Sequence, residues 1–144
     1  MSAQFVVAVC FVIVRGGEVL LLRRSSRSEH AAGHWETGSG RLEVDEDPAS
    51  AVLREVHEET GLVVGVDRIL NCFHFRRGSE RQPAVGITFG CQYVSGAVNL
   101  SNEHSEHRWV EGRDLRQYQM LEAIYETIEG YLANSNKPTP QGFE

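Results

Sequence analysis

Three glutamates, Glu55, Glu58 and Glu59, lie close together in a segment whose pattern predicts a helix. At positions i, i+3 and i+4 their side chains share one helix face, with Cβ atoms roughly 5–6 Å apart. At an effective dielectric of about 20, each pair of like charges about 5 Å apart costs on the order of 3 kcal/mol. A divalent cation among them reverses this balance, and Mg²⁺ and Mn²⁺ prefer such oxygen ligands. The spacing therefore predicts either a metal site or a solvated, glutamate-rich surface.

The helix that carries these carboxylates has well-marked ends. Asp47 is a good N-cap residue, and Pro48 suits the first helical position because its missing N–H would have no partner there. Gly61 can adopt the left-handed conformation that ends a helix. Apolar residues fall on the neighbouring arc, so we expect the carboxylate face to border a face that packs on the core. These apolar residues are Val52, Leu53 and Val56.

Residues 40–62 resemble the Nudix box, the signature of the Nudix hydrolase family. That pattern is Gly, five residues, Glu, seven residues, Arg-Glu, an aliphatic residue, any residue, Glu-Glu, any residue, Gly and an aliphatic residue. Every fixed position is matched here, by Gly40, Glu46, Arg54, Glu55, Val56, Glu58, Glu59, Gly61 and Leu62. A match at so many spaced positions is highly specific, and it favours the metal site over the solvated surface.

The resemblance implies roles for the residues of the box. The implied ligands of one or more Mg²⁺ ions, for which Mn²⁺ could substitute, are the Gly40 carbonyl and the carboxylates of Glu55, Glu58 and Glu59. Arg54, predicted to point away from that face, is expected to orient a glutamate rather than to touch substrate. Glu46 is a second orienting or metal-binding candidate. The chain departs from the family at Gly38-Ser39, where Pro-Gly is common, and this affects the loop conformation more than the chemistry.

A further catalytic glutamate is expected near Trp109. The segment from residue 102 to residue 110 resembles one that Nudix enzymes often carry before the last strand, where such a glutamate lies in a loop. Glu103, six positions before Trp109, is our candidate for the general base. Glu106 and the box residue Glu55 are the alternatives.

Several other side chains are weaker candidates. Arg23, Arg24 and Arg27 form either a solvated surface or a contact to substrate phosphate. The candidates for substrate binding are Arg24, Arg41 and Phe75. Trp35 is interpreted as a core residue in preference to a base-stacking one.

Two histidines in the expected loop, His104 and His107, suggest a zinc site. The signal is weak because they lie three residues apart in a presumed loop and no further ligand accompanies them.

The composition describes a single acidic domain. The 144 residues can bury a normal core, and we expect one domain over residues 1–133 and a flexible tail over residues 134–144. The net charge of −6 argues against a protein that coats nucleic acid. The first apolar run is too short to span a membrane. The cysteines are expected to be buried, reduced thiols of a cytoplasmic protein, and a homodimer is compatible with the sequence. These cysteines are Cys10, Cys72 and Cys91.

Around the box helix the pattern predicts strands and a second helix. The predicted strands cover residues 4–14, 19–22, 69–75 and 85–94. Apolar residues three and four apart between Met120 and Leu132 predict a packing helix in a segment that turns helical from Arg113 onward. This order indicates an α/β fold, and the resemblance implies the Nudix-type α/β/α sandwich with a mixed central sheet.

The resemblance also implies a reaction, the metal-dependent hydrolysis of a nucleoside diphosphate linked to another group. Such chemistry needs neutralised phosphoryl oxygens and an in-line water more than a covalent nucleophile. Signature residues of the ADP-ribose, diadenosine polyphosphate and coenzyme A subgroups are not recognised here, which favours (deoxy)nucleoside triphosphates, cleaved to monophosphate and pyrophosphate. The alternatives are nucleotide sugars, dinucleoside polyphosphates, or a non-catalytic nucleotide-binding sensor module. We expect no nucleic acid polymer and no membrane as partner.

Overall fold

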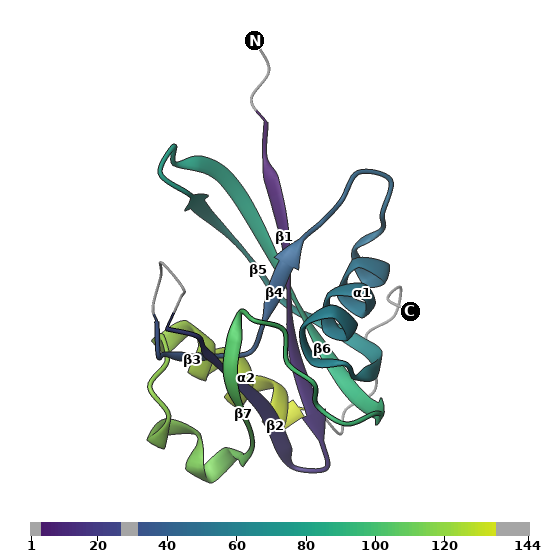
Figure 1. Cartoon of the computed structure of the whole chain (residues 1–144), viewed down its shortest axis with the longest axis vertical. Helices are drawn as coiled ribbons and strands as arrows, with labels where there is room; N and C mark the ends of the chain where they lie inside the picture. Colours follow the sequence, from purple (N-terminus) through teal and green to yellow (C-terminus); the bar gives the residue numbers. More distant parts are fainter. Residues whose placement is uncertain (1–3, 27–31, 135–144) are drawn as a thin grey trace.

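The computed structural model describes residues 4–26 and 32–134, and within these ranges a seven-stranded sheet is covered by two α-helices (Figure 1). The strands are β1 (Val6–Arg15), β2 (Glu18–Arg24), β3 (Trp35–Glu36), β4 (Ser39–Arg41), β5 (Val63–Arg77), β6 (Gln82–Ser95) and β7 (His104–Glu111). The helices are α1 (Pro48–Thr60), the 3-10 helix η1 (Gly112–Gln117) and α2 (Glu122–Asn134). Arg27 and the expected tail beyond Asn134 lie outside the described residues.

The sheet is mixed, as predicted, and β1 lies at its centre. Its order is β3-β2-β1-β6-β5, with β4 paired to β1 and β7 paired to β2. β1 runs parallel to β6 but antiparallel to β2 and β4. The β1–β4 register places Gly40 opposite Val9, so the first residue of the box lies against the central strand.

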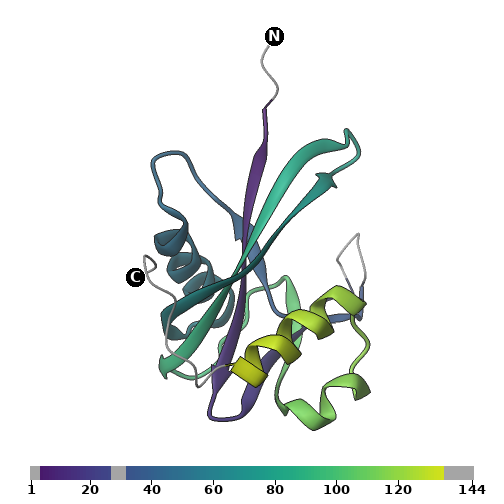
Figure 2. The same cartoon turned by 180° about the vertical axis from the view of Figure 1, so that it is seen from behind.

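Alternate residues of β1 face two separate cores, because successive side chains of a strand point to opposite faces. The first core contains Val9, Phe11 and Ile13 of β1 with Ala51, Val52 and Val56 of α1. The second contains Val12 and Val14 of β1 with Ile128 and Tyr131 of α2. Figures 1 and 2, which view the molecule from opposite sides, show α1 over one face of the sheet and α2 over the other. This is the expected α/β/α sandwich.

Three local expectations are wrong. Leu53, expected to face the core, is 43% exposed. The final helix does not begin near Arg113, because η1 ends at Gln117 and α2 starts only at Glu122. The connection between them instead runs beside β3, where the Trp35 N–H donates to the Gln119 carbonyl at 3.0 Å. The cysteines also differ from the prediction, since Cys91 is buried, Cys10 is half-buried and Cys72 is exposed.

Trp35 packs as the sequence suggested. Its ring meets that of Tyr118 edge to face, with centroids 5.1 Å apart, at the second core. In the described parts of the chain, no helix is both long enough and apolar enough to cross a membrane.

Candidate active site

Helix α1 presents its three carboxylates at different depths. The Asp47 side chain accepts a hydrogen bond from the Ser50 N–H at 3.1 Å, and Gly61 ends the helix with φ +75°, as its sequence predicted. The Glu59 side chain is buried, that of Glu55 is mostly covered, and that of Glu58 is 57% exposed. The face therefore runs from the solvent down into the sheet.

Gly40 on β4 lies directly against the carboxylate of Glu55. A Cβ atom at position 40 would come within 1.9 Å of Glu55 Cδ, so any other residue would displace the Glu55 carboxylate from its place. Glycine thus serves a close approach here rather than an unusual backbone angle. The backbone of β4 and the carboxylate of Glu55 are therefore in direct proximity at the pocket that both line.

Arg54 holds the glutamates of the box together. Its Nε donates to Glu46 at 2.7 Å, and its Nη1 donates to Glu55 at 2.8 Å and to Glu58 at 3.2 Å. A further bond from Nη2 reaches the Arg41 carbonyl at 3.2 Å. The hydrogen bonds from Arg54 lower the pKa of Glu46. Arg54 thus contacts the carboxylates, and the expectation that it points away from them is wrong, while its role in orienting a glutamate stays a prediction.

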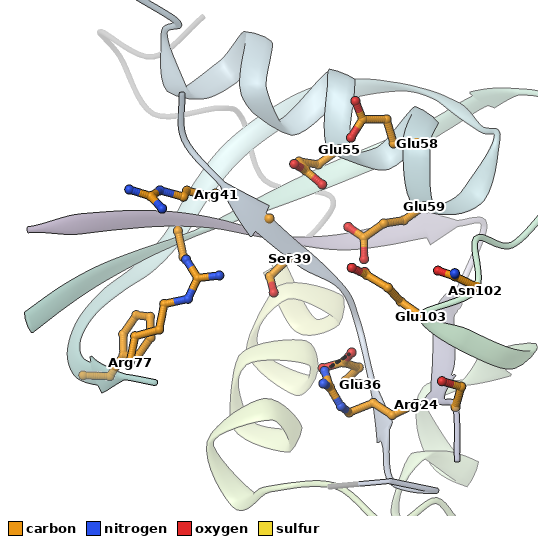
Figure 3. Close-up of a pocket in the computed structure, with 14 residues that line it drawn as sticks. Arg24, Glu36, Ser39, Arg41, Glu55, Glu58, Glu59, Arg77, Asn102 and Glu103 are labelled. Atoms are coloured by element: carbon orange, nitrogen blue, oxygen red, sulfur yellow. Dashed lines mark hydrogen bonds and ion pairs between the residues drawn. The ribbon is translucent and has the colours of Figure 1, made fainter. Parts of the chain in front are cut away.

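Glu103 lines the same pocket of about 630 Å³ as the box carboxylates, and one of its carboxylate oxygens lies within 4.8 Å of one oxygen of Glu59. Figure 3 shows its carboxylate directed at that of Glu59. The Glu103 carbonyl accepts a hydrogen bond from the Ser25 N–H at 3.0 Å, which ties the loop before β7 to the end of β2. Glu106 does not line the pocket and pairs instead with Arg23 at 2.7 Å and Arg108 at 3.0 Å.

All of the proposed substrate-binding residues also line this pocket. They are Arg24, Arg41 and Phe75, to which the structure adds Ser39, Arg77 and Asn102. Figure 3 shows Arg41 and Arg77 at the side of the pocket away from Glu103. The guanidinium of Arg24 is 3.0 Å from the carboxylate of Glu36 on β3.

Two carboxylates of the pocket, those of Glu55 and Glu59, have raised pKa values. Burial, together with the charges of Glu103, Glu55 and Glu36, raises the pKa of Glu59 to about 9. Burial also raises the pKa of Glu55, although Arg54 opposes the shift. Among the described residues, Glu59 Oε2 is buried without a hydrogen-bond partner. An all-oxygen donor set with an unsatisfied buried oxygen fits a hard divalent cation such as Mg²⁺ or Mn²⁺.

This shift predicts that the metal-free protein loses stability as the pH rises. Because the folded-state pKa of Glu59 is raised, the folded protein holds a proton that the unfolded chain releases at lower pH. The free energy of unfolding should therefore fall by roughly 2–3 kcal/mol between about pH 6 and about pH 8. Denaturant unfolding in chelator across this range measures the slope, and added Mg²⁺ should flatten it. If the free energy of unfolding in chelator did not change between these pH values, the raised pKa of Glu59 would be contradicted.

Two polar side chains meet next to Glu59: Glu36, which lines the pocket and which the sequence analysis did not select, and His104, which it named only as a weak zinc candidate. His104 lies at the start of β7, not in a loop, and its Nε2 is 2.7 Å from Glu36 Oε2. Its Nδ1 is 4.0 Å from Glu59 Oε1. Within the described ranges, the group of side chains that could share an ion is Glu59, Glu103 and His104, without His107. Glu36 on β3 and His104 on β7 come together because both strands pair with β2. This contact depends on the sheet, so no spacing in the sequence indicates it.

A second, mainly apolar pocket of about 350 Å³ adjoins the first. It lies between the sheet and α2 and shares Glu36 and Ser39 with the acidic pocket. Its walls include Phe73, Leu121 and Ile124, with polar atoms from residues such as Asn71 and Thr88. The two pockets together offer one charged compartment and one apolar compartment.

Comparison with known proteins identifies this arrangement. A family profile described as NUDIX domain matches residues 4–130. The chain belongs to the Nudix family. It is 31% identical to the MutT protein of Methanosarcina mazei Go1, whose crystal structure superposes with a TM-score of 0.70 over 95% of this chain and 99% of that one. A Nudix hydrolase from Nitrosomonas europaea is 25% identical, with a TM-score of 0.75 over 94% and 93% of the two chains.

Curated Nudix relatives have related names. A MutT-like protein of Streptomyces ambofaciens is 34% identical over 72% of this chain, and the match spans 62% of that protein's length. The CTP pyrophosphohydrolase of Escherichia coli K12 is 29% identical over 90% of this chain and 93% of its own. This chain is accordingly a Nudix hydrolase whose relatives include pyrophosphohydrolases.

Proposed function

We propose that this Nudix hydrolase is a divalent-metal-dependent pyrophosphohydrolase that cleaves (deoxy)nucleoside triphosphates to monophosphate and pyrophosphate. The observation that carries the proposal is the acidic pocket of about 630 Å³, in which the Glu103 carboxylate from a separate loop lies beside the box carboxylate Glu59. Arginines at the edge of the same pocket supply positive charge for phosphate oxygens. These are Arg24, Arg41 and Arg77.

The residues of the pocket divide the chemistry among them. The Gly40 carbonyl and the carboxylates of Glu55, Glu58 and Glu59 would hold Mg²⁺ or Mn²⁺. The cation would supply neutralisation of phosphoryl oxygens and activation of water. Glu103 would serve as general base toward the attacking water, since its carboxylate approaches from a loop independent of α1. Arg54 fixes Glu55 and Glu58 through its hydrogen bonds to both.

The apolar pocket supports a nucleoside as the group joined to the phosphates. Its apolar walls suit the faces of a base, and the side chains of Asn71 and Thr88 can bond to base edges. With the base there, the phosphate chain would cross Ser39 into the acidic pocket, where Phe75 lies on the wall. The names of relatives, CTP pyrophosphohydrolase and nucleoside triphosphatase NudI, agree with this class of substrate. We place the enzyme in the cytoplasm, where an exposed thiol such as Cys72 stays reduced.

The products of a nucleotide panel test this proposal. With Mg²⁺, a nucleoside triphosphate should yield the monophosphate and pyrophosphate as primary products, and chelator should abolish turnover. Anion-exchange chromatography of the products measures both outcomes. Orthophosphate as the sole primary product would make the protein a phosphatase. Binding of nucleotides with no turnover under any metal would instead support the sensor module, and faster cleavage of ADP-ribose or nucleotide sugars would change the substrate class.

A further inference from the structure

A chain of charged contacts fixes the orientation of the buried His104 ring. Arg24 pairs with Glu36, and Glu36 Oε2 is 2.7 Å from His104 Nε2. A carboxylate held by Arg24 accepts hydrogen bonds, so Nε2–H is assigned as the donor to Glu36, and Nδ1, on the other side of the ring, points away from Glu36.

The Nδ1 atom lies next to Glu59, a residue that lines the acidic pocket. It lies 4.0 Å from Glu59 Oε1, and these two side chains are only 2% and 5% exposed. One oxygen of Glu59, one oxygen of Glu103 and a ring nitrogen of His104 lie within 4.8 Å of one another. Among the described residues, neither His104 Nδ1 nor Glu59 Oε2 has a hydrogen-bond partner. Two buried polar atoms without a partner on neighbouring side chains are unfavourable unless a proton or a cation lies between these side chains.

We propose that Glu59, Glu103 and His104 Nδ1 form a cation position with a nitrogen ligand, which binds Mn²⁺ or another first-row transition metal more tightly than Mg²⁺. Imidazole suits transition metals, whereas Mg²⁺ takes oxygen ligands almost exclusively. A carboxylate that holds the second ring nitrogen is the usual support of a metal-binding histidine, and Glu36 occupies that place here.

The position differs from the all-oxygen set of Gly40, Glu55 and Glu58, although it shares Glu59 with the ligands proposed above. The inference rests on the proposed function only in treating Glu59 as a metal ligand, and it gives Glu103, the proposed general base, a metal-binding role in addition. A proton shared between Glu59 and Nδ1 is the competing explanation for the same contact, and it predicts no bond between nitrogen and metal.

Mn²⁺ itself is the probe, because its electron spin reports directly bound nitrogen. Metal-free protein is titrated with Mn²⁺ and with Mg²⁺ by calorimetry, and the Mn²⁺ complex is measured by electron spin echo modulation. We expect nitrogen modulation in the wild type and in the matched control His107→Gln, and its loss in His104→Gln. His104→Gln should weaken Mn²⁺ binding by about 10-fold or more and Mg²⁺ binding by less than about 3-fold.

A second preparation covers the case in which His104→Gln does not fold, since this ring is buried. In wild-type protein labelled with ¹⁵N-histidine, the modulation of the bound Mn²⁺ signal should change from the ¹⁴N pattern to the ¹⁵N pattern. This result identifies a histidine ligand without any mutation. Bound Mn²⁺ without histidine coupling, in a protein that still hydrolyses nucleotides with Mg²⁺, overturns this inference and leaves the proposed function standing. Coupling that persists in folded His104→Gln overturns it as well. Absence of both metal binding and hydrolysis would contradict the proposed function too.

Discussion

Glu103→Gln should lower kcat by roughly 10²- to 10⁴-fold, the range for loss of a general base, while the melting temperature stays near that of the wild type. The carboxylate lies in an exposed loop position, so glutamine there leaves the cores intact. It also faces Glu59 across the pocket, where an attacking water would lie between the proton acceptor and the metal ligands. Steady-state kinetics at saturating Mg²⁺ and a thermal melt of the same sample measure the two quantities.

Glu106→Gln is the matched control, because it makes the same change three residues further along the chain. Glu106 forms partly exposed ion pairs with Arg23 and Arg108 outside the pocket, and such pairs contribute little to stability. Its kcat should remain close to that of the wild type. Loss of activity only in Glu106→Gln would move the general base to that residue, and near-normal rates in both variants would assign it to Glu55 or another carboxylate of the box.

Glu59→Gln should separate activity from stability. Losing one preorganised charged ligand should lower kcat by at least about 10²-fold. In chelator, however, the variant should unfold at higher denaturant than the wild type at alkaline pH, because it removes a buried carboxyl group whose pKa is raised to about 9. Because the variant lacks this carboxyl group, the predicted fall in the free energy of unfolding with rising pH should also be absent.

Glu58→Gln is the control for the measurement of unfolding stability against pH. Its side chain is 57% exposed, so the variant should keep the pH slope of the wild type in chelator. Kinetics in Mg²⁺ and denaturant unfolding in chelator, measured on all three proteins, give the comparison. A near-normal rate for Glu59→Gln would contradict the metal site, and an unchanged slope would show that Glu59 ionises normally in the folded protein.

The sequence by itself determined the box helix and the type of chemistry, because both depend on short-range spacing. Asp47, Pro48 and Gly61 act within one turn of the helix ends, and the structure has them in the predicted roles. Glu55, Glu58 and Glu59 share a face because of the helical repeat alone. The main strands were predictable for the same reason, since runs of β-branched residues flanked by turns are local signals. The mixed sheet and the two helical layers then followed from their order and from the family resemblance.

Only the tertiary structure decided how deeply each carboxylate is buried and which distant groups meet it. A periodic pattern shows which side of a helix is apolar but not where burial on that side ends. Leu53 was therefore expected in the core, although it is exposed, and the burial of Glu59 was not foreseen. The start of α2 depends on the connection packing beside β3, a contact that no local repeat encodes. Glu36 and His104 are 68 positions apart and meet because β2 pairs with both β3 and β7. Sheet register of this kind arises from packing of the whole chain, and therefore no spacing within the sequence could indicate it.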